Sequence, residues 1–374
     1  MKTKILSIAA AGLLLLAACT GKTMEDTADS SAAADSVNKD TSAKTIKPSE
    51  PAPAWAPSIK PEMQAVIEKL ASYGDKPIPE LSAKDARKNH TPTDAVMDLM
   101  AEHNIPKPVF NVDTMGKDVL VEGGSVHVRI YTPKTDKTAY PVIVYYHGGG
   151  FVIANLDVYD ASANVLADKT EAIVVSVAYR LTPEHKFPIA HNDAYAAYEW
   201  VLKNAASFKG DAKKVAVAGE SAGGNLAINT AIKARDNKVM IPTAILAVYP
   251  VAGSDMNTPS YKKNEMAKPL DKPMMMWFVK NYLKSTDQAT DPRINLVAAN
   301  LKGLPPTTII TAEIDPLQSE GMLLGDKLKA AGVAVDSKNY DGVTHEFFGM
   351  GAIVPQAMDA EMYAVEQLKK AFGM

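Results

Sequence analysis

The chain has 374 residues, of which 47% are hydrophobic and 22% charged, with a formal net charge of −3 at pH 7. This length and apolar fraction are typical of one large α/β domain with additional segments. The slightly acidic balance, without a basic tract or interleaved basic and aromatic residues, excludes the usual nucleic-acid-binding classes. We therefore expect no nucleic-acid partner.

Residues 1–18 have the pattern of an export signal. Lys2 and Lys4 precede an apolar stretch, residues 5–18, that is too short to span a membrane comfortably. The stretch ends in Leu-Ala-Ala followed by Cys19, which resembles the bacterial lipobox, where the cysteine becomes the first residue and is lipidated. Cys19 is the only cysteine of the chain, so no intramolecular disulfide can form. We expect a membrane anchor at Cys19, with an ordinary cleaved signal as the alternative.

Residues 19–58 are rich in Ala, Ser, Thr, Asp and Lys and, toward the end, in Pro. They contain almost no large apolar residues, which predicts a disordered tether between the anchor and a folded domain at residues 59–374. Thr20 stands where the lipoprotein pattern has Asp for inner-membrane retention. The sequence therefore favours the outer membrane as the location.

The folded part begins with two segments of helical spacing, residues 61–73 and about 91–104. Residues 109–121 and 126–131 then alternate apolar and polar side chains around a Gly-Gly pair, which predicts a hairpin. Residues 141–146 are continuously apolar, as in a strand buried on both faces of a parallel sheet.

From there strands and helices alternate, which predicts an α/β fold with a mostly parallel, doubly wound sheet. The alternation stops between residues 254 and 289, which we interpret as an insertion over the functional site. Its Met-Met-Met-Trp-Phe run at 274–278 either lines a binding pocket or is the buried face of an amphipathic helix. The expected strands are 172–178, 214–218, 244–249, 307–312 and 333–340, and the expected helices are 160–169, 190–206, 225–232, 321–330 and 355–371.

The pentapeptide Gly-Glu-Ser-Ala-Gly at 219–223 lies between an apolar strand and a helix. In this context the serine of a G-x-S-x-G motif sits on a tight, strained turn with its hydroxyl exposed. Both flanking positions are glycine because a side chain there would collide with the strand or the helix. The pattern predicts that Ser221 is a nucleophile, and the alternative is a small-residue turn that merely contains a serine.

A serine nucleophile needs a base and an oriented acid, which in α/β-hydrolases follow it in the order acid, then histidine. Of the 7 histidines only His345 lies after Ser221, so chain order selects it as the base. Asp315 directly follows the strand at 307–312, where such sheets place functional residues, and Glu313 is the alternative acid.

The tetrahedral intermediate of acyl transfer needs N–H donors for its oxyanion. The loop formed by His147, Gly148, Gly149 and Gly150 suits this role because glycines let backbone amides approach a ligand closely. The N–H of Ala222, directly after the nucleophile, is expected to complete the oxyanion hole, and His147 to order the loop. The chain has no zinc-binding spacing and no phosphate loop, so we expect neither a metal nor a cofactor.

Five motifs together resemble the hormone-sensitive-lipase-like esterases, the bacterial family IV carboxylesterases of the α/β-hydrolase fold. The similarity runs from about residue 60 to the end of the chain. Glu220 departs mildly from the family, in which many members have Asp there. The motifs lie at 147–151, 179–185, 219–225, 315–317 and 345–347.

The resemblance implies a Ser221, Asp315 and His345 triad that cleaves short- to medium-chain acyl esters without a metal. It also implies oxyanion donors at Gly149, Gly150 and Ala222, with Gly148 as an alternative donor. A helical cap is implied at about 59–108 and 254–290. Two other functions remain open: a carbohydrate acetyl esterase with the same mechanism, and a non-catalytic small-molecule receptor on the same fold. The sequence leaves the oligomeric state open.

Overall fold

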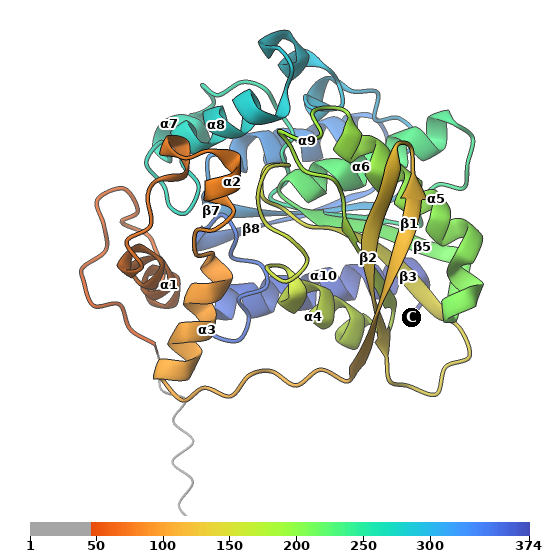
Figure 1. Ribbon diagram of the computed structural model, residues 1–374, viewed down its shortest axis with the longest axis horizontal. Helices are drawn as coiled ribbons and strands as arrows, with labels where there is room; N and C mark the ends of the chain where they lie inside the picture. The colour runs from red at the N-terminus through yellow and green to blue at the C-terminus, as the bar shows by residue number, and fades with distance from the viewer. Residues whose placement is uncertain (1–45) are drawn as a thin grey trace, which may run out of the picture. The chain divides into compact units, whose positions relative to one another are not determined.

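The computed structural model describes residues 46–374, and an eight-stranded sheet forms the centre of this part of the chain (Figure 1). The strand order is β1-β2-β4-β3-β5-β6-β7-β8; β1 and β2 are antiparallel, β2 pairs antiparallel with β4, and the remaining pairs are parallel. The predicted α/β fold is therefore confirmed. The strands are β1 Val112–Val121, β2 Gly124–Pro133, β3 Tyr140–Tyr146, β4 Ile173–Ala178, β5 Gly210–Glu220, β6 Ile245–Val248, β7 Thr307–Ile314 and β8 Val335–Thr344.

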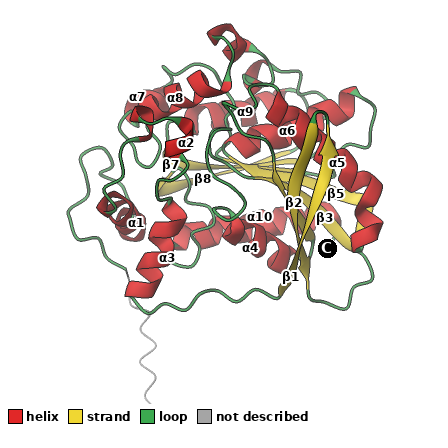
Figure 2. Cartoon of the chain, in the orientation of Figure 1, coloured by secondary structure: helices red, strands yellow, loops and turns green. Residues whose placement is uncertain are grey.

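Helices cover both faces of the sheet (Figure 2). Helices α5, α6 and α9 pack in one hydrophobic cluster, and α1, α3, α4 and α10 pack in the other. The helices are α1 Pro61–Ser72, α2 Ala83–Ala86, α3 Pro92–Glu102, α4 Asp160–Thr170, α5 Ile189–Asn204, α6 Ala222–Asp236, α7 Pro259–Lys263, α8 Lys272–Tyr282, α9 Gln318–Ala330 and α10 Pro355–Phe372.

Strand β3 shows why the sequence forms this layered arrangement. All of its residues are buried, and successive side chains point to opposite faces of the sheet. Val142 and Val144 belong to the cluster under α5 and α6, whereas Ile143 and Tyr145 belong to the cluster under α4 and α10. The continuous apolar run is thus needed to fill two cores at once.

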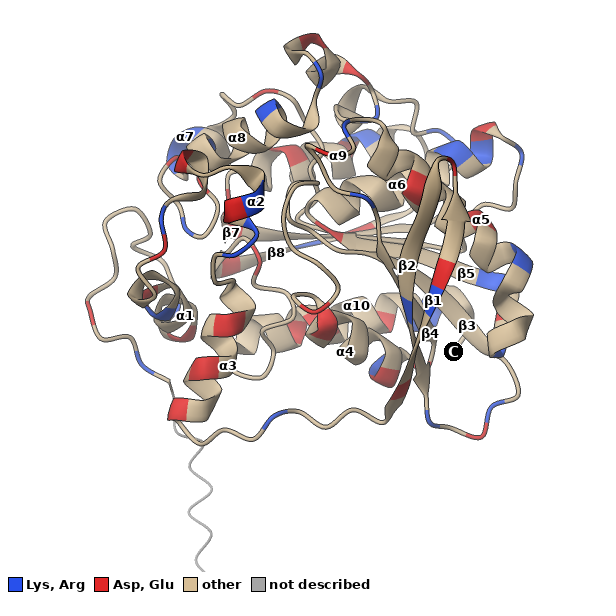
Figure 3. Cartoon of the chain, in the orientation of Figure 1, with Lys and Arg blue, Asp and Glu red and all other residues tan. Residues whose placement is uncertain are grey.

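The two helices expected before the sheet are α1 and α3, within one or two residues of their predicted bounds. Thr91 caps α3 in a capping box with Asp94, which fixes the start of the helix. Lys69 of α1 pairs with Glu102 of α3 at 2.6 Å, and Figure 3 shows acidic residues along α3. Both helices pack against the flank of the sheet, and α1 also lines the cavity described below.

The chain between α1 and α3 contains two short helical segments that were not predicted, a 3₁₀ turn at Ile78–Glu80 and α2. Each segment has too few residues to show a helical period. They pack against α8, and the indole N–H of Trp277 donates to the Leu81 carbonyl at 3.1 Å. The segments before the sheet and between β6 and β7 are thereby joined over the carboxyl ends of the strands.

The predicted end of the disordered tether, at residue 58, is wrong. Residues 46–58 were expected to be disordered, but Ile46 is buried and the Ser49 hydroxyl donates to Glu68 of α1 at 2.7 Å. Proline-rich composition therefore did not prevent this segment from packing, because α1 offers it a partner. The expected signal at 1–18, Cys19 and the rest of the tether to residue 45 lie outside the described residues. Across 46–374, no helix is sufficiently long and apolar to span a membrane.

Candidate active site

Ser221 lies between the end of β5 and the start of α6, on a strained turn. Its φ is +55° and ψ −116°, and its N–H donates to the Val248 carbonyl at 2.8 Å. A Cβ at Gly219 would lie 2.2 Å from the Gly223 oxygen, and a Cβ at Gly223 would lie 1.9 Å from the Tyr146 oxygen. The expected steric reason for both glycines is therefore found in the structure.

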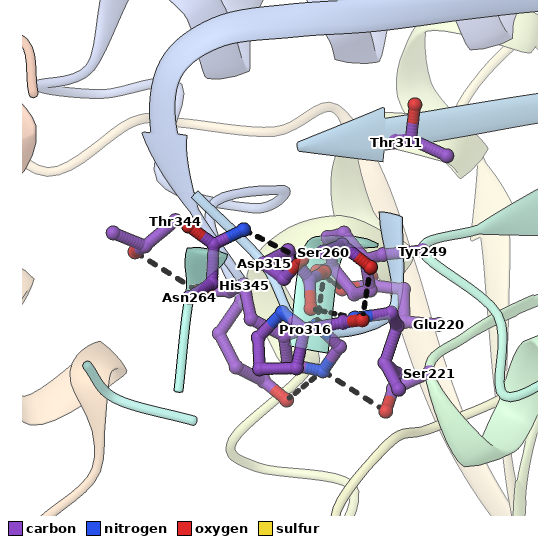
Figure 4. A network of polar contacts seen from close by, with 12 residues as sticks. Glu220, Ser221, Tyr249, Ser260, Asn264, Thr311, Asp315, Pro316, Thr344 and His345 are labelled. Carbon is purple, nitrogen blue, oxygen red and sulfur yellow. Dashed lines mark hydrogen bonds and ion pairs between the residues drawn. The ribbon is translucent and has the colours of Figure 1, made fainter. Parts of the chain in front are cut away.

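His345 and Asp315 lie in line with Ser221, as Figure 4 shows. The Ser221 Oγ is 3.0 Å from His345 Nε2, and Nδ1 of the same ring is 2.7 Å from Asp315 Oδ2. A hydrogen on Nδ1 leaves Nε2 free to accept from the serine hydroxyl. Burial lowers the pKa of His345, but the facing Asp315 carboxylate, together with Glu346 and Glu220, outweighs burial, and the net pKa is raised. The ring is thus ready to take a proton from Ser221.

Asp315 follows β7 and is held by its neighbours from two sides. Its Oδ1 accepts from the Leu317 N–H at 2.8 Å, and its backbone carbonyl accepts from the Asn264 side chain at 3.0 Å. Ser260 of α7 donates to the Pro316 carbonyl at 2.6 Å. The insertion between β6 and β7 therefore fixes the loop that carries the acid.

Glu313, the alternative acid, is engaged elsewhere. Its carboxylate accepts from the Ser58 hydroxyl at 2.9 Å and from the Gly342 N–H at 2.8 Å, and it pairs with Lys263 at 3.1 Å. The structure brings Asp315, not Glu313, to the imidazole of His345.

The loop after β3 lies beside the serine. Gly149 and Gly150 have φ of +91° and +58°, and both line the cavity that contains Ser221. A Cβ at Gly150 would lie 2.3 Å from the Phe278 ring, so glycine is required there for two reasons. Within 46–374 the N–H groups of Gly149 and Gly150 donate no hydrogen bond to the protein, which leaves them available to an oxyanion. Gly148 is not among the residues that line the cavity.

His147 and Tyr179 hold this loop in place. The Tyr179 hydroxyl donates to the carbonyls of His147 and Gly148 at 2.9 and 3.1 Å, and the two rings stack with centroids 4.4 Å apart. Burial lowers the pKa of His147 to about 4, so the ring is neutral at pH 7. His147 lies at the start of the glycine loop, with its ring stacked on that of Tyr179.

A cavity of about 710 Å³ opens above Ser221 and His345. Met274, Met275 and Phe278 of α8 line it, so the methionine–aromatic run both faces the cavity and buries part of its surface in the core. Across residues 46–374, no cluster of three or more His, Cys, Asp or Glu side chains is arranged to hold a metal ion.

Three functional candidates were not singled out from the sequence: Tyr159, Arg87 and Glu346. The Arg87 guanidinium donates to the Val152 and Thr182 carbonyls at 2.7 Å and to Glu184 at 2.8 Å, which ties the segment around α2 to the glycine loop. Only Glu346 could have been suspected from the sequence, because it directly follows His345. Tyr159 and Arg87 are far in sequence from the residues that they contact.

The chain is similar to known esterases along most of its length. A family model described as alpha/beta hydrolase fold matches residues 143–349. The carboxylesterase NlhH of Mycobacterium tuberculosis is 36% identical over 298 residues, which cover 78% of this chain and 89% of that protein. An ethyl acetate hydrolase of Pseudomonas putida is 30% identical over 321 residues, covering 84% and 99%.

A solved structure gives the same result. The hyperthermophilic esterase from Pyrobaculum calidifontis superposes with a TM-score of 0.77 at 34% identity, over 84% of this chain and 98% of that one. The chain therefore belongs to the hormone-sensitive-lipase-like carboxylesterases of the α/β-hydrolase fold and is an enzyme that hydrolyses carboxylic esters.

Proposed function

We propose that this carboxylesterase acts through a Ser221, His345 and Asp315 triad on short- to medium-chain acyl esters. The observation that carries the proposal is the buried line of hydrogen bonds from Ser221 Oγ through His345 to Asp315. His345 Nε2 takes the serine proton while Oγ attacks the ester carbonyl. Asp315 holds the ring in the tautomer that leaves Nε2 unprotonated in the free enzyme.

The oxyanion of the tetrahedral intermediate is bound by backbone N–H groups of Gly149, Gly150 and Ala222. Collapse of the intermediate breaks the bond to the alcohol oxygen, which receives the proton from Nε2. A water then attacks the acyl carbon and loses its proton to His345. The second intermediate collapses by breaking the bond to Ser221 Oγ, which takes the proton back from Nε2 as the carboxylic acid leaves. The availability of both glycine N–H groups supports this assignment.

The acyl group is assigned to the part of the cavity lined by Met274, Met275 and Phe278. Their apolar surface suits a hydrocarbon chain, and thioethers adapt to different chain shapes. The volume of about 710 Å³ is within the range of pockets for small molecules. A related protein named for ethyl acetate hydrolysis supports a preference that begins at short acyl groups.

The test is hydrolysis of p-nitrophenyl esters of increasing acyl length by wild type and Ser221→Ala. We expect wild-type activity with a short- to medium-chain optimum, and loss in the mutant by as much as about a millionfold in kcat. Ser125→Ala, an exposed serine on β2, is the matched control and retains activity. Activity in Ser221→Ala would contradict the triad. Wild type inactive on these esters but active on acetylated polysaccharides would favour the carbohydrate esterase, and ligand binding without turnover would favour a receptor.

We also propose that the enzyme is held at the outer membrane through lipidated Cys19, with residues 20–45 between anchor and domain. The apolar stretch that ends at Cys19 supports the anchor. Several acyl chains on one residue give stable rather than marginal membrane attachment.

A further inference from the structure

A second carboxylate lies beside the imidazole of His345, on the side that faces Ser221. Glu346 Oε1 is 3.8 Å from His345 Nε2, while Asp315 Oδ2 is 2.7 Å from Nδ1. Glu346 lines the same cavity as Ser221 and His345. The ring therefore has a carboxylate near each of its nitrogens, and the mechanism above uses only one of them.

Tyr159 holds the Glu346 carboxylate in place. Its hydroxyl lies 2.7 Å from Oε1 and 2.6 Å from Oε2, and it donates its proton to the carboxylate. The same hydroxyl lies against the glycine loop, because a Cβ at Gly148 would be only 2.2 Å away from it. Tyr159 is buried, so its ring cannot move freely. Glu346 is thus fixed relative to both the imidazole and the oxyanion loop.

The backbone of Glu346 is in an unfavourable conformation. Its φ is +68°, in the left-handed region that is sterically unfavourable for a non-glycine residue. Strain of this kind persists where the surrounding structure enforces it and tends to cluster at functional sites. The strained backbone of Glu346 thus motivates asking what its carboxylate does beside His345.

We propose that Glu346, held by Tyr159, is a positioning residue for ester hydrolysis that stabilises His345 electrostatically while the ring carries the proton from Ser221. This inference rests on the proposed triad. At 3.8 Å the carboxylate is too far from Nε2 to accept a hydrogen bond, so it does not compete with Ser221 or the leaving group for the proton. It remains close enough to attract the imidazolium ion through the low-dielectric interior.

Several other ionisable groups act on His345 or lie near it. Asp315 is hydrogen-bonded to it, Tyr249 of the segment after β6 packs on its ring at 4.5 Å between centroids, and Glu220 and Glu320 act at longer range. Glu220 accepts from the Tyr145 and Tyr249 hydroxyls and Glu320 from the Ala252 N–H. Burial raises the pKa of both Glu220 and Glu320 to about 8, so both carry less charge near pH 7. Of these carboxylates, Glu346 is the one within 4 Å of Nε2 in the described residues.

Glu346→Gln is the direct test, because the amide oxygen can still accept from Tyr159 while the charge is lost. We expect kcat to fall about tenfold for each unit by which the pKa of His345 drops, with little change in KM. Removing a nearby negative charge makes the protonated ring less stable, which lowers its pKa. The acid limb of the kcat/KM profile should therefore move to lower pH.

Tyr159→Phe changes the ionisation of Glu346 without removing its carboxyl group. Without the hydroxyl, the pKa of Glu346, already raised by burial, rises further because one stabilising hydrogen bond is gone. The carboxyl is then neutral over a wider pH range, and activity falls there as in Glu346→Gln. At higher pH the carboxyl ionises, so we expect the activity of Tyr159→Phe relative to wild type to recover, whereas that of Glu346→Gln does not.

Controls distinguish the two proposals. Glu346→Asp keeps the charge and should keep the wild-type acid limb, and Glu361→Gln removes another buried carboxyl and should leave the limb in place. Melting temperatures show that each variant is folded. If Glu346→Gln is folded and its acid limb does not move, the inference about Glu346 is wrong, whether or not the variant is active. The proposed triad still stands in that case, provided that Ser221→Ala is inactive. An active Ser221→Ala overturns both.

Discussion

Glu220, on the turn that carries the nucleophile, makes the stability of the fold depend on pH. Its side chain is fully buried directly before Ser221, and the hydroxyls of Tyr145 and Tyr249 donate to it. Burial raises the pKa of Glu220 to about 8, so the folded protein holds this proton at pH values where the unfolded chain has lost it. Such a group stabilises the fold fully below its unfolded pKa and loses this contribution as pH rises through the folded pKa.

We therefore predict that Glu220→Gln flattens the decrease in stability between about pH 5 and pH 8, by at most about 1.4 kcal/mol per pH unit. The measurement is the free energy of unfolding by urea at several pH values. The exposed carboxyl of Glu366 is the control, and Glu366→Gln should leave the slope unchanged. Parallel curves for wild type and Glu220→Gln would show that the carboxyl does not carry this proton in the folded state.

At the scale of the element, α8 determines the shape of the cavity. Asp271 caps the helix by accepting from the Met274 N–H at 2.8 Å, and Phe278 lies against Gly150. The neighbours Met275 and Met276 lie on different sides of this helix: Met275 is 6% exposed and lines the cavity, whereas Met276 is 57% exposed. They form a matched pair of identical side chains.

We predict that Met275→Ala destabilises the protein by about 2–5 kcal/mol and moves the acyl-length optimum toward longer chains. The first effect follows from lost burial and the second from added space in the cavity. Met276→Ala should change neither property. Thermal unfolding together with the p-nitrophenyl ester series checks both variants, and an unchanged optimum in a folded Met275→Ala would place the acyl chain elsewhere in the cavity.

At the scale of the whole molecule, the catalytic domain is separated by sequence from its proposed anchor. We predict that wild type incorporates radiolabelled palmitate and is recovered with the outer membrane, and that Cys19→Ser loses the label and the membrane association. Thr20→Asp should keep the label but move the protein to the inner membrane. Labelled Cys19→Ser would contradict lipidation at this residue, and outer-membrane Thr20→Asp would contradict the sorting argument. Esterase activity in each variant reports that the domain has folded.

The sequence by itself determined the fold class, the family and most element positions. Buried parallel strands need apolar runs such as residues 141–146, and a serine on a tight turn needs glycines at 219 and 223, so these patterns can be recognised locally. Chain order was sufficient to select His345. Asp315 was favoured over Glu313 because it directly follows a strand, and such folds place functional residues where the strands end. The similarity to known esterases confirms the family, while the roles of the residues stay predictions.

Only the tertiary structure decided which distant side chains meet. Tyr159 and Glu346 are 187 positions apart yet are hydrogen-bonded, and Arg87 donates to the Val152 carbonyl, 65 positions away. No local periodicity encodes such contacts, because they depend on how separate segments pack. For the same reason residues 46–58 were expected to be disordered from their composition, although α1 provides a surface against which they pack. Composition describes what a segment can bury, and the packing of the rest of the chain determines whether a partner is there to receive it.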